Sequence, residues 1–318
     1  MGLRRPVGQR ALEPRGAGGR HADRAFAGGV QTPQRKPPRR GSGRAGALAG
    51  QSGRGDGVQL RLDRSGVSAG GMRLPPRVDV LLITGGPYHD MDHARLALLG
   101  FMAEHERMRV TVREGYAADD IAAADVIVTY TCDRVPDDPA LDALTAFVEG
   151  GGRWFALHGT NSRMVLDGDK PVVCPPLPER LLDLLGSQFA AHPVPGRFKV
   201  KPVGAHDLTR GLSAFFVEDE QYLQHHLPGN EVLLETEFEG ETPLFETAQW
   251  ARAAHQVMYL RARGEGAVLY LTLGHTRGRY DMRPVAEEYP FVERGSWDHP
   301  DFQTLIRRGL RWTMKETI

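Results

Sequence analysis

The stretch that decides the fold is Gly150-Gly151-Gly152-Arg153-Trp154-Phe155-Ala156-Leu157-His158-Gly159-Thr160-Asn161-Ser162. Three glycines end a helical segment, an apolar run follows, and that run stops at His158 among small residues. This order is typical of a strand in an open parallel sheet that delivers one functional side chain to the carboxyl edge, where such folds bind ligands. The stretch holds no cysteine, which argues against thiol-based acyl transfer. The alternative is a histidine that only caps a buried strand.

Upstream of this stretch, short apolar runs alternate with segments of helical periodicity. Such alternation indicates β-α-β units and a parallel sheet, and right-handed crossovers then place the carboxyl ends of the strands along one edge. We expect His89, Cys132 or Asp133, and His158 at that edge. The predicted strands span residues 78–84, 109–113, 125–130 and 153–157, and the predicted helices span 91–106 and 139–149.

The second half of the chain has a less regular pattern, and its strands suit an extension of the same sheet better than an independent domain. The predicted fold is therefore one α/β domain at residues 72–318, with a mostly parallel sheet, helices on both faces and extra β-strands from the second half. The predicted elements here are helices at 180–185 and 302–314 and strands at 198–202, 215–218, 231–235, 256–261 and 267–273.

Residues 1–71 differ in composition from the rest. They hold 14 Lys/Arg and 4 Asp/Glu, whereas the remainder of the 318-residue chain holds 26 and 36. They are rich in Gly, Arg, Pro and Ala, so we expect a disordered basic tail that cannot bury enough apolar surface to offset its ordering entropy. It could be an organelle-targeting peptide, a nonspecific nucleic-acid-binding arm or an over-extended reading frame. We favour the last, with Met72 as the initiator.

Other features narrow the class of protein. No apolar run approaches the ~20 residues of a membrane-spanning helix, and no signal-peptide core precedes the domain. The two cysteines, Cys132 and Cys174, lie far apart, which argues against a disulfide scaffold or a cysteine zinc site and fits a reducing setting. The sequence therefore predicts a cytoplasmic protein with no membrane segment and no specific nucleic-acid partner.

Histidines follow the ends of three predicted strands, at His89, His158 and His275. Glu220 interrupts an otherwise apolar strand, where a carboxylate is costly to bury unless it is paired or coordinated. We predict that His158 and Glu220 form the catalytic acid–base pair, with His89 and His275 positioning substrate hydroxyls. His89, His158 and His275 could equally hold a divalent metal that polarises a sugar or carbonyl oxygen. A divalent metal is the one cofactor that the sequence suggests.

Each candidate also has a structural alternative. Glu220 could form an ion pair with an arginine, and His275 could bond to the backbone at a strand end. His93 stands at the spacing of a second ligand beside His89, but the two straddle a turn rather than lying within a helix. We interpret four further histidines as shaping loops or exposed turns; these are His192, His206, His225 and His226.

Seven short motifs, in order over about residues 77–314, resemble the ThuA-like family of trehalose utilisation. The motifs are Gly85-Gly86-x-x-His89, Gly150-Gly151-Gly152 followed by His158, Gly186-x-x-Phe189-x-x-His192-Pro193, His206-Asp207-Leu208-Thr209-Arg210-Gly211-Leu212, Asp219-Glu220-x-Tyr222, Gly264-x-Gly266 and Leu273-Gly274-His275. The resemblance implies a variant of the flavodoxin-like fold of class I glutamine amidotransferases. The amidotransferase cysteine and the late His-x-Glu pair are missing here, so amidotransferase activity is not implied.

The resemblance also implies a function in carbohydrate metabolism, often beside sugar oxidoreductases. Two hypotheses follow: an isomerase or hydrolase acting on a disaccharide or keto-sugar, or a catalytically silent module that binds a carbohydrate or a partner oxidoreductase. A homo-oligomer is compatible with both. Residues 163–178 form an unusual insertion after His158 that could act as a lid or alter substrate choice. Besides His89 and His275, the expected substrate-binding residues are Gly86, Asn161, Asp219 and Tyr222.

Overall fold

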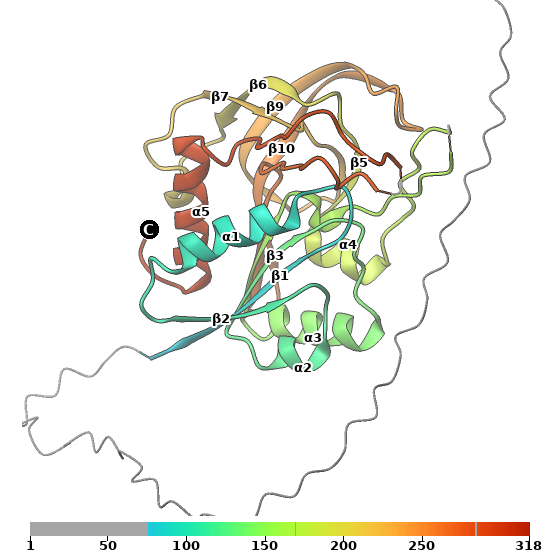
Figure 1. Ribbon diagram of the computed structural model, residues 1–318. Helices are drawn as coiled ribbons and strands as arrows, with labels where there is room; N and C mark the ends of the chain where they lie inside the picture. Colours follow the sequence, from blue (N-terminus) through green and yellow to red (C-terminus); the bar gives the residue numbers. More distant parts are fainter. Residues whose placement is uncertain (1–75, 169, 284) are drawn as a thin grey trace, which may run out of the picture. The chain divides into compact units, whose positions relative to one another are not determined.

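Parallel strands form one half of a nine-stranded sheet in the computed structural model, which describes residues 76–168, 170–283 and 285–318. The chain order β2-β1-β3-β4 along this half reverses direction at β1, as in flavodoxin-like sheets (Figure 1). The next strand, β11, comes from near the end of the chain and pairs in parallel with β4. The five strands are β1 (Val78–Gly85), β2 (Met108–Arg113), β3 (Val126–Thr131), β4 (Arg153–Leu157) and β11 (Gly266–Leu271).

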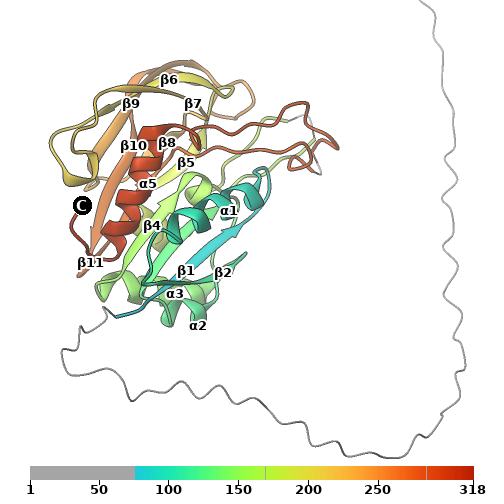
Figure 2. The same cartoon turned by 60° about the vertical axis from the view of Figure 1, so that its left-hand side comes forward.

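The second half of the sheet is antiparallel and continues from β11 in the order β10-β9-β6-β7. A separate two-stranded sheet joins β5 to β8. Figure 2 shows the antiparallel strands rising away from the parallel half. The elements are β5 (Ser187–Ala191), β6 (Gly196–Pro202), β7 (Phe215–Asp219), β8 (Leu223–His226), β9 (Glu231–Glu241) and β10 (Gln249–Arg263).

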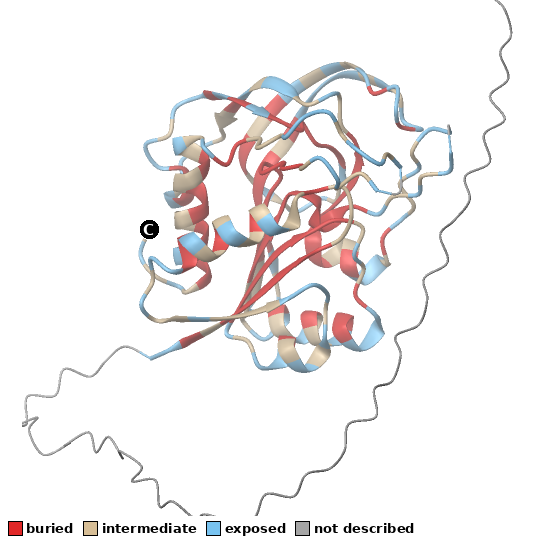
Figure 3. Cartoon of the chain, viewed as in Figure 1, coloured by how far each residue is buried: buried red, intermediate tan, exposed pale blue. Residues whose placement is uncertain are grey.

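Helices cover both faces of the parallel half. Strand side chains alternate between faces, so Leu82 of β1 packs in one apolar cluster while Leu81 and Ile83 pack in the other. The first cluster lies under α1 (Met91–Met102) and α5 (Pro300–Thr313), and the second lies under α2 (Ala118–Ala122), α3 (Asp138–Glu149) and α4 (Glu179–Leu185). In Figure 3 the central strands are accordingly buried along most of their length.

The predicted α/β fold is confirmed, and the strand at 153–157 has the predicted limits. The long strands β9 and β10 run well past their predicted ends, and the short elements α2, β5 and β8 were not predicted. The expectation of an exposed turn at His225 and His226 is wrong in part, because both lie in β8 and only His225 is exposed. The predictions for residues 1–71 and Met72 fall outside the described residues. Within those residues, no helix is long and apolar enough to cross a membrane.

Two helical glycines test how tightly α5 packs on the sheet. A Cβ on Gly309 would lie 2.3 Å from Cε1 of the fully buried Phe155 in β4, whereas a Cβ on the exposed Gly100 of α1 would meet nothing within 4 Å. Alanine in place of glycine favours a helix by about 1 kcal/mol, but overpacking a core costs about 1–3 kcal/mol. We predict that Gly309→Ala lowers the free energy of unfolding and that Gly100→Ala raises it slightly, as measured by urea denaturation. Equal effects would contradict this packing.

Candidate functional site

Three parallel strands deliver the histidines to one edge, each through a special backbone turn. After β1, Gly86 has φ +122° and a Cβ there would overlap the Cys132 carbonyl, so only glycine fits and His89 can turn inward. At the end of β4, His158 itself has φ 46° and opens the 3-10 helix His158–Asn161. After β11, Gly274 has φ +117° directly before His275. The predicted convergence of these histidines is therefore seen.

Glu220 directly follows β7, the strand at the other end of the sheet from β2, and its side chain reaches the same place. The preceding residue, Asp219, holds β7 against the loop after β11: its carboxylate accepts hydrogen bonds from the backbone N–H groups of Gly274 (2.9 Å), His275 (3.0 Å) and Ser296 (3.0 Å). The Ser296 hydroxyl and the N–H of Glu220 also donate to it. Asp219, expected to bind substrate, is thus engaged by protein donors and ties the two halves of the sheet together.

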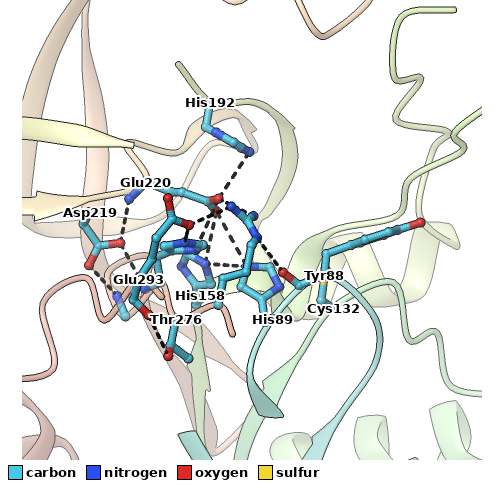
Figure 4. A network of polar contacts seen from close by, with 12 residues as sticks. Tyr88, His89, Cys132, His158, His192, Asp219, Glu220, Thr276 and Glu293 are labelled. Atoms are coloured by element: carbon cyan, nitrogen blue, oxygen red, sulfur yellow. Dashed lines mark hydrogen bonds and ion pairs between the residues drawn. The ribbon is translucent and has the colours of Figure 1, made fainter. Parts of the chain in front are cut away.

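The side chains of His89, His158, Glu220 and His275 meet in one buried cluster, hereafter the histidine–glutamate cluster; at most 5 % of any of them is exposed. Nε2 of His158 lies 2.9 Å from Nε2 of His89 and 3.4 Å from Oε2 of Glu220. Oε2 of Glu220 is 3.6 Å from Nε2 of His89, and its Oε1 is 3.2 Å from Nδ1 of His275. Figure 4 shows these contacts converging on the Glu220 carboxylate.

Groups outside the cluster fix the orientation of its members. Nδ1–H of His158 donates to the Thr272 carbonyl at 2.7 Å, so the lone pair of the neutral ring lies on Nε2, inside the cluster. Nε2 of His275 donates to Oε2 of Glu293 at 2.7 Å, which leaves Nδ1 inside. The Arg277 guanidinium donates to Oε1 of Glu220 at 2.9 Å and to Oε2 of Glu293 at 2.8 Å. A carbonyl, a carboxylate and a guanidinium therefore aim the inner atoms at a common point.

The electrostatics of the cluster follow from this burial and pairing. Burial would raise the pKa of Glu220, but the nearby His192 and His275 and the hydrogen bonds that it accepts hold that pKa well below its ordinary value. Burial lowers the pKa of His275, but Glu220 and Glu293 raise it to about 9. Burial lowers the pKa of His89 to about 3. An ionised carboxylate thus faces one neutral and one protonated imidazole.

A cavity of about 220 Å³ opens onto the cluster, and His89 and Glu220 form part of its wall. His158 lies behind His89 rather than on the wall. The rest of the wall is largely apolar and aromatic, with Phe189, Tyr222 and Phe245 among its residues. The insertion at 163–178 contributes Met164, Leu166 and Val172 to the same wall.

Of the other predicted residues, Tyr222 lies on the wall, and its ring centroid is 4.4 Å from that of His158. Asn161 is buried and donates to Ser187 instead of lining the cavity. His93 lies outside the cluster, where its Nδ1 pairs with the Thr276 hydroxyl at 3.1 Å. Gly86 has no side chain, and its contribution to the site is the backbone turn that lets His89 point inward.

Sequence reasoning missed three members of the site. Arg277 and Glu293 lie in an irregular segment after β11, where nothing in the sequence pattern distinguishes them. His192 was expected to shape a loop, but it borders the cavity with Nε2 3.6 Å from Oε1 of Glu220. Its position in the motif with Phe189, which also lines the cavity, was the signal that could have found it. The structural alternative for Glu220, an ion pair with an arginine, is also present, with Arg277 as the partner, and it coexists with the histidine contacts.

The cluster also has the composition of a metal centre. His89, His158, Glu220 and His275 each offer one ligand atom, and these four atoms lie within 4.8 Å of one another. The fold and this site together define a flavodoxin-like α/β protein with a buried histidine–carboxylate centre at the carboxyl edge of its sheet.

The comparison with known families agrees with this class. Residues 79–288 match the family model described as ThuA, trehalose utilisation, and the chain therefore belongs to the ThuA family. A comparison with curated proteins gives no match. The fold is similar to that of a ThuA-like protein from Parabacteroides merdae, with a TM-score of 0.52, 15% identity and coverage of 76% of this chain and 91% of the other.

A ThuA-like protein from Bacteroides uniformis is similar to the same degree, with a TM-score of 0.53, 15% identity and coverage of 78% and 95%. At such low identity these two structures support the fold alone.

The role of Asp219 can be tested against its neighbour on β7. Asparagine keeps one acceptor oxygen but places an NH₂ group against backbone N–H donors that now bond to a carboxylate. Breaking buried charge-assisted hydrogen bonds costs about 1.5–3 kcal/mol each, so we predict that Asp219→Asn lowers the free energy of unfolding by at least about 2 kcal/mol. Glu218→Gln, at the exposed preceding position, should change it by less than about 0.5 kcal/mol. Denaturant unfolding of both variants measures the free energy of unfolding. Equal losses in the two variants would show that Asp219 does not hold the two halves of the sheet together.

Proposed function

We propose that this ThuA-family chain is a cytoplasmic enzyme of carbohydrate metabolism that acts on a disaccharide or a keto-sugar in an isomerase or hydrolase step. The observation that carries the proposal is the meeting of three imidazoles and an ionised carboxylate at the end of an aromatic-lined cavity. Imidazoles exchange protons near neutral pH, and flat apolar walls suit the C–H faces of a sugar ring. Perturbed titratable groups in a cleft are typical of acid–base sites.

The geometry supports a division of roles. The Thr272 carbonyl fixes His158 in the tautomer whose Nε2 can accept a proton, and His89, 2.9 Å away, connects that atom with the cavity wall. Glu220 lies 3.4 Å from the same atom and would stabilise the imidazolium that forms. His158 and Glu220 are therefore the proposed acid–base pair. His89 lies between His158 and the cavity, where it would contact the substrate.

The cavity size indicates how much of the substrate is enclosed. Its volume of about 220 Å³ is below the roughly 300–1,000 Å³ of sites for drug-sized ligands. One sugar ring would be enclosed next to the cluster, and a second ring of a disaccharide would extend toward the mouth, between the insertion at 163–178 and His192.

The proposal predicts large and separable effects on turnover. His158→Ala and Glu220→Gln should each lower kcat by about 10²-fold or more, the range for a lost general acid or base, while His225→Ala, exposed on β8, should leave it unchanged. The measurement is product analysis by NMR after incubation of the protein with a panel of disaccharides and their keto forms. An isomerase gives a product of equal mass, and a hydrolase gives two monosaccharides.

A different outcome favours the binding module. If the unaltered protein binds sugars from the panel without converting any, or if folded His158→Ala retains full turnover, the proposed enzyme is wrong. His158 would then serve as a structural cap at the end of β4.

A further inference from the structure

We infer that the histidine–glutamate cluster is a binding site for one divalent transition-metal ion, with Nε2 of His89, Nε2 of His158, Nδ1 of His275 and the Glu220 carboxylate as its ligands. In the metal-bound protein, Nε2 of His158 and the Glu220 carboxylate would act as ligands of the ion rather than as a free acid–base pair. It rests on the proposed function only for the reaction, because metal binding can be measured without any substrate.

The separations of the inner atoms support a common ion. Around a zinc ion with bonds of about 2.0–2.1 Å, tetrahedral ligand atoms lie about 3.3 Å from one another. The observed separations are 2.9 Å between the two Nε2 atoms and 3.4 and 3.6 Å from these to Oε2 of Glu220, and the ligand atoms of all four residues lie within 4.8 Å of one another. The three rings are steeply inclined rather than stacked, with interplanar angles of 85°, 73° and 53°. Such rings can point their nitrogens at one centre.

The protons of the cluster also leave a place for a cation. The N–H of His158 is committed to Thr272 and that of His275 Nε2 to Glu293. Between the Nε2 atoms of His158 and His89 only one hydrogen bond can form, and the Glu220 carboxylate faces both. A cation in the centre would be attracted by all of these atoms at once. Ligating histidines typically donate their outer N–H to a carboxylate or a backbone carbonyl, and both kinds of partner are present here.

The charge balance points the same way. Asp219, Glu220 and Glu293 carry three formal negative charges around the cluster, and the Arg277 guanidinium donates to the carboxylates of two of them, Glu220 and Glu293. An ion bound at Nδ1 of His275 would displace the proton that this ring carries without the ion, and the divalent cation would then balance the two negative charges that Arg277 leaves. Arg277 occupies Oε1 of Glu220 and so orients the carboxylate.

The ligand types select the class of ion. Three imidazole nitrogens favour zinc, iron, nickel or copper, whereas magnesium and calcium prefer oxygen ligands. His89 and Glu220 belong to both the cluster and the cavity wall, so a substrate oxygen that entered as a fifth ligand would approach from the cavity. When bound there, the ion would supply Lewis-acid polarisation of a substrate carbonyl or hydroxyl oxygen.

The test is a metal titration of protein purified without an affinity tag, stripped with a chelator and dialysed. Isothermal titration calorimetry with Zn²⁺ and with Co²⁺ should give about one ion per chain, and Mg²⁺ should not compete. Glu220→Gln and His275→Gln should weaken Zn²⁺ binding by at least about 100-fold, and Glu293→Gln, which alters only an outer partner, by about 10–100-fold. Circular dichroism checks that each variant is folded, and Glu293→Gln keeps the test decisive if a ligand variant is not.

Two control variants make the result specific. His93→Ala removes the histidine that the sequence spacing pairs with His89 but that lies outside the cluster. His226→Ala removes a half-buried histidine of β8 whose ring nitrogens have no hydrogen-bond partner among the described residues, and which could therefore bind Zn²⁺ elsewhere. Both should bind Zn²⁺ as the unaltered protein does. Binding that survives Glu220→Gln and His275→Gln but is lost in His226→Ala, or no binding by the unaltered protein, would overturn the proposal.

The outcome is separable from that of the sugar panel. Stoichiometric Zn²⁺ binding at the cluster without sugar turnover would contradict the proposed enzyme and leave the metal site standing. Sugar turnover by chelator-treated protein that binds no Zn²⁺ or Co²⁺ would contradict the metal site and leave the proposed enzyme standing.

Discussion

The rest of the site depends on one constraint, the burial of the Glu220 carboxylate. Moving an ionised carboxylate out of water costs several kcal/mol unless partners replace the water on every side. Only 1 % of Glu220 is exposed, and its partners come from segments far apart in the chain: His89 after β1, His158 after β4, and His275 and Arg277 after β11. The carboxylate therefore forces the antiparallel extension and the parallel half to meet at one place.

The backbone at this edge is strained in a way that fits a functional site. Tyr88, Asp133 and His158 have φ of 71°, 50° and 46°, and they follow β1, β3 and β4 respectively. Such conformations cost of order 1–3 kcal/mol for residues other than glycine, and they persist where the surroundings over-determine them. For His158, the rigid strand on one side and the Thr272 carbonyl on the other hold the ring. The strain keeps Nε2 directed inward at the cluster.

The sequence was sufficient to predict the strands of the parallel half and the positions of the three histidines, because both depend on local sequence patterns. A strand that ends at a glycine turn exposes its next polar residue at the carboxyl edge, so His89, His158 and His275 could be placed without knowing the tertiary structure. Arg277, Glu293 and His192 could not, because their positions depend on how irregular segments fold back over the edge. The motif Asp219-Glu220-x-Tyr222 predicts Asp219 as a substrate ligand, whereas its partners in the structure are backbone N–H groups and the Ser296 hydroxyl, which only the assembled fold supplies.

The walls of the cavity, rather than the cluster, are the part of this site that can set substrate choice. The insertion is joined to the wall by backbone pairing: Val165 pairs with Val173, and Val172 pairs with Phe245. A change of side chain or length in 163–178 would therefore move Phe245 and reshape the cavity, while the cluster, held by Asp219 and Arg277 from the other side, would keep its geometry. Chemistry and selectivity thus rest on separate elements, so the reacting groups can stay fixed while the enclosed ring changes.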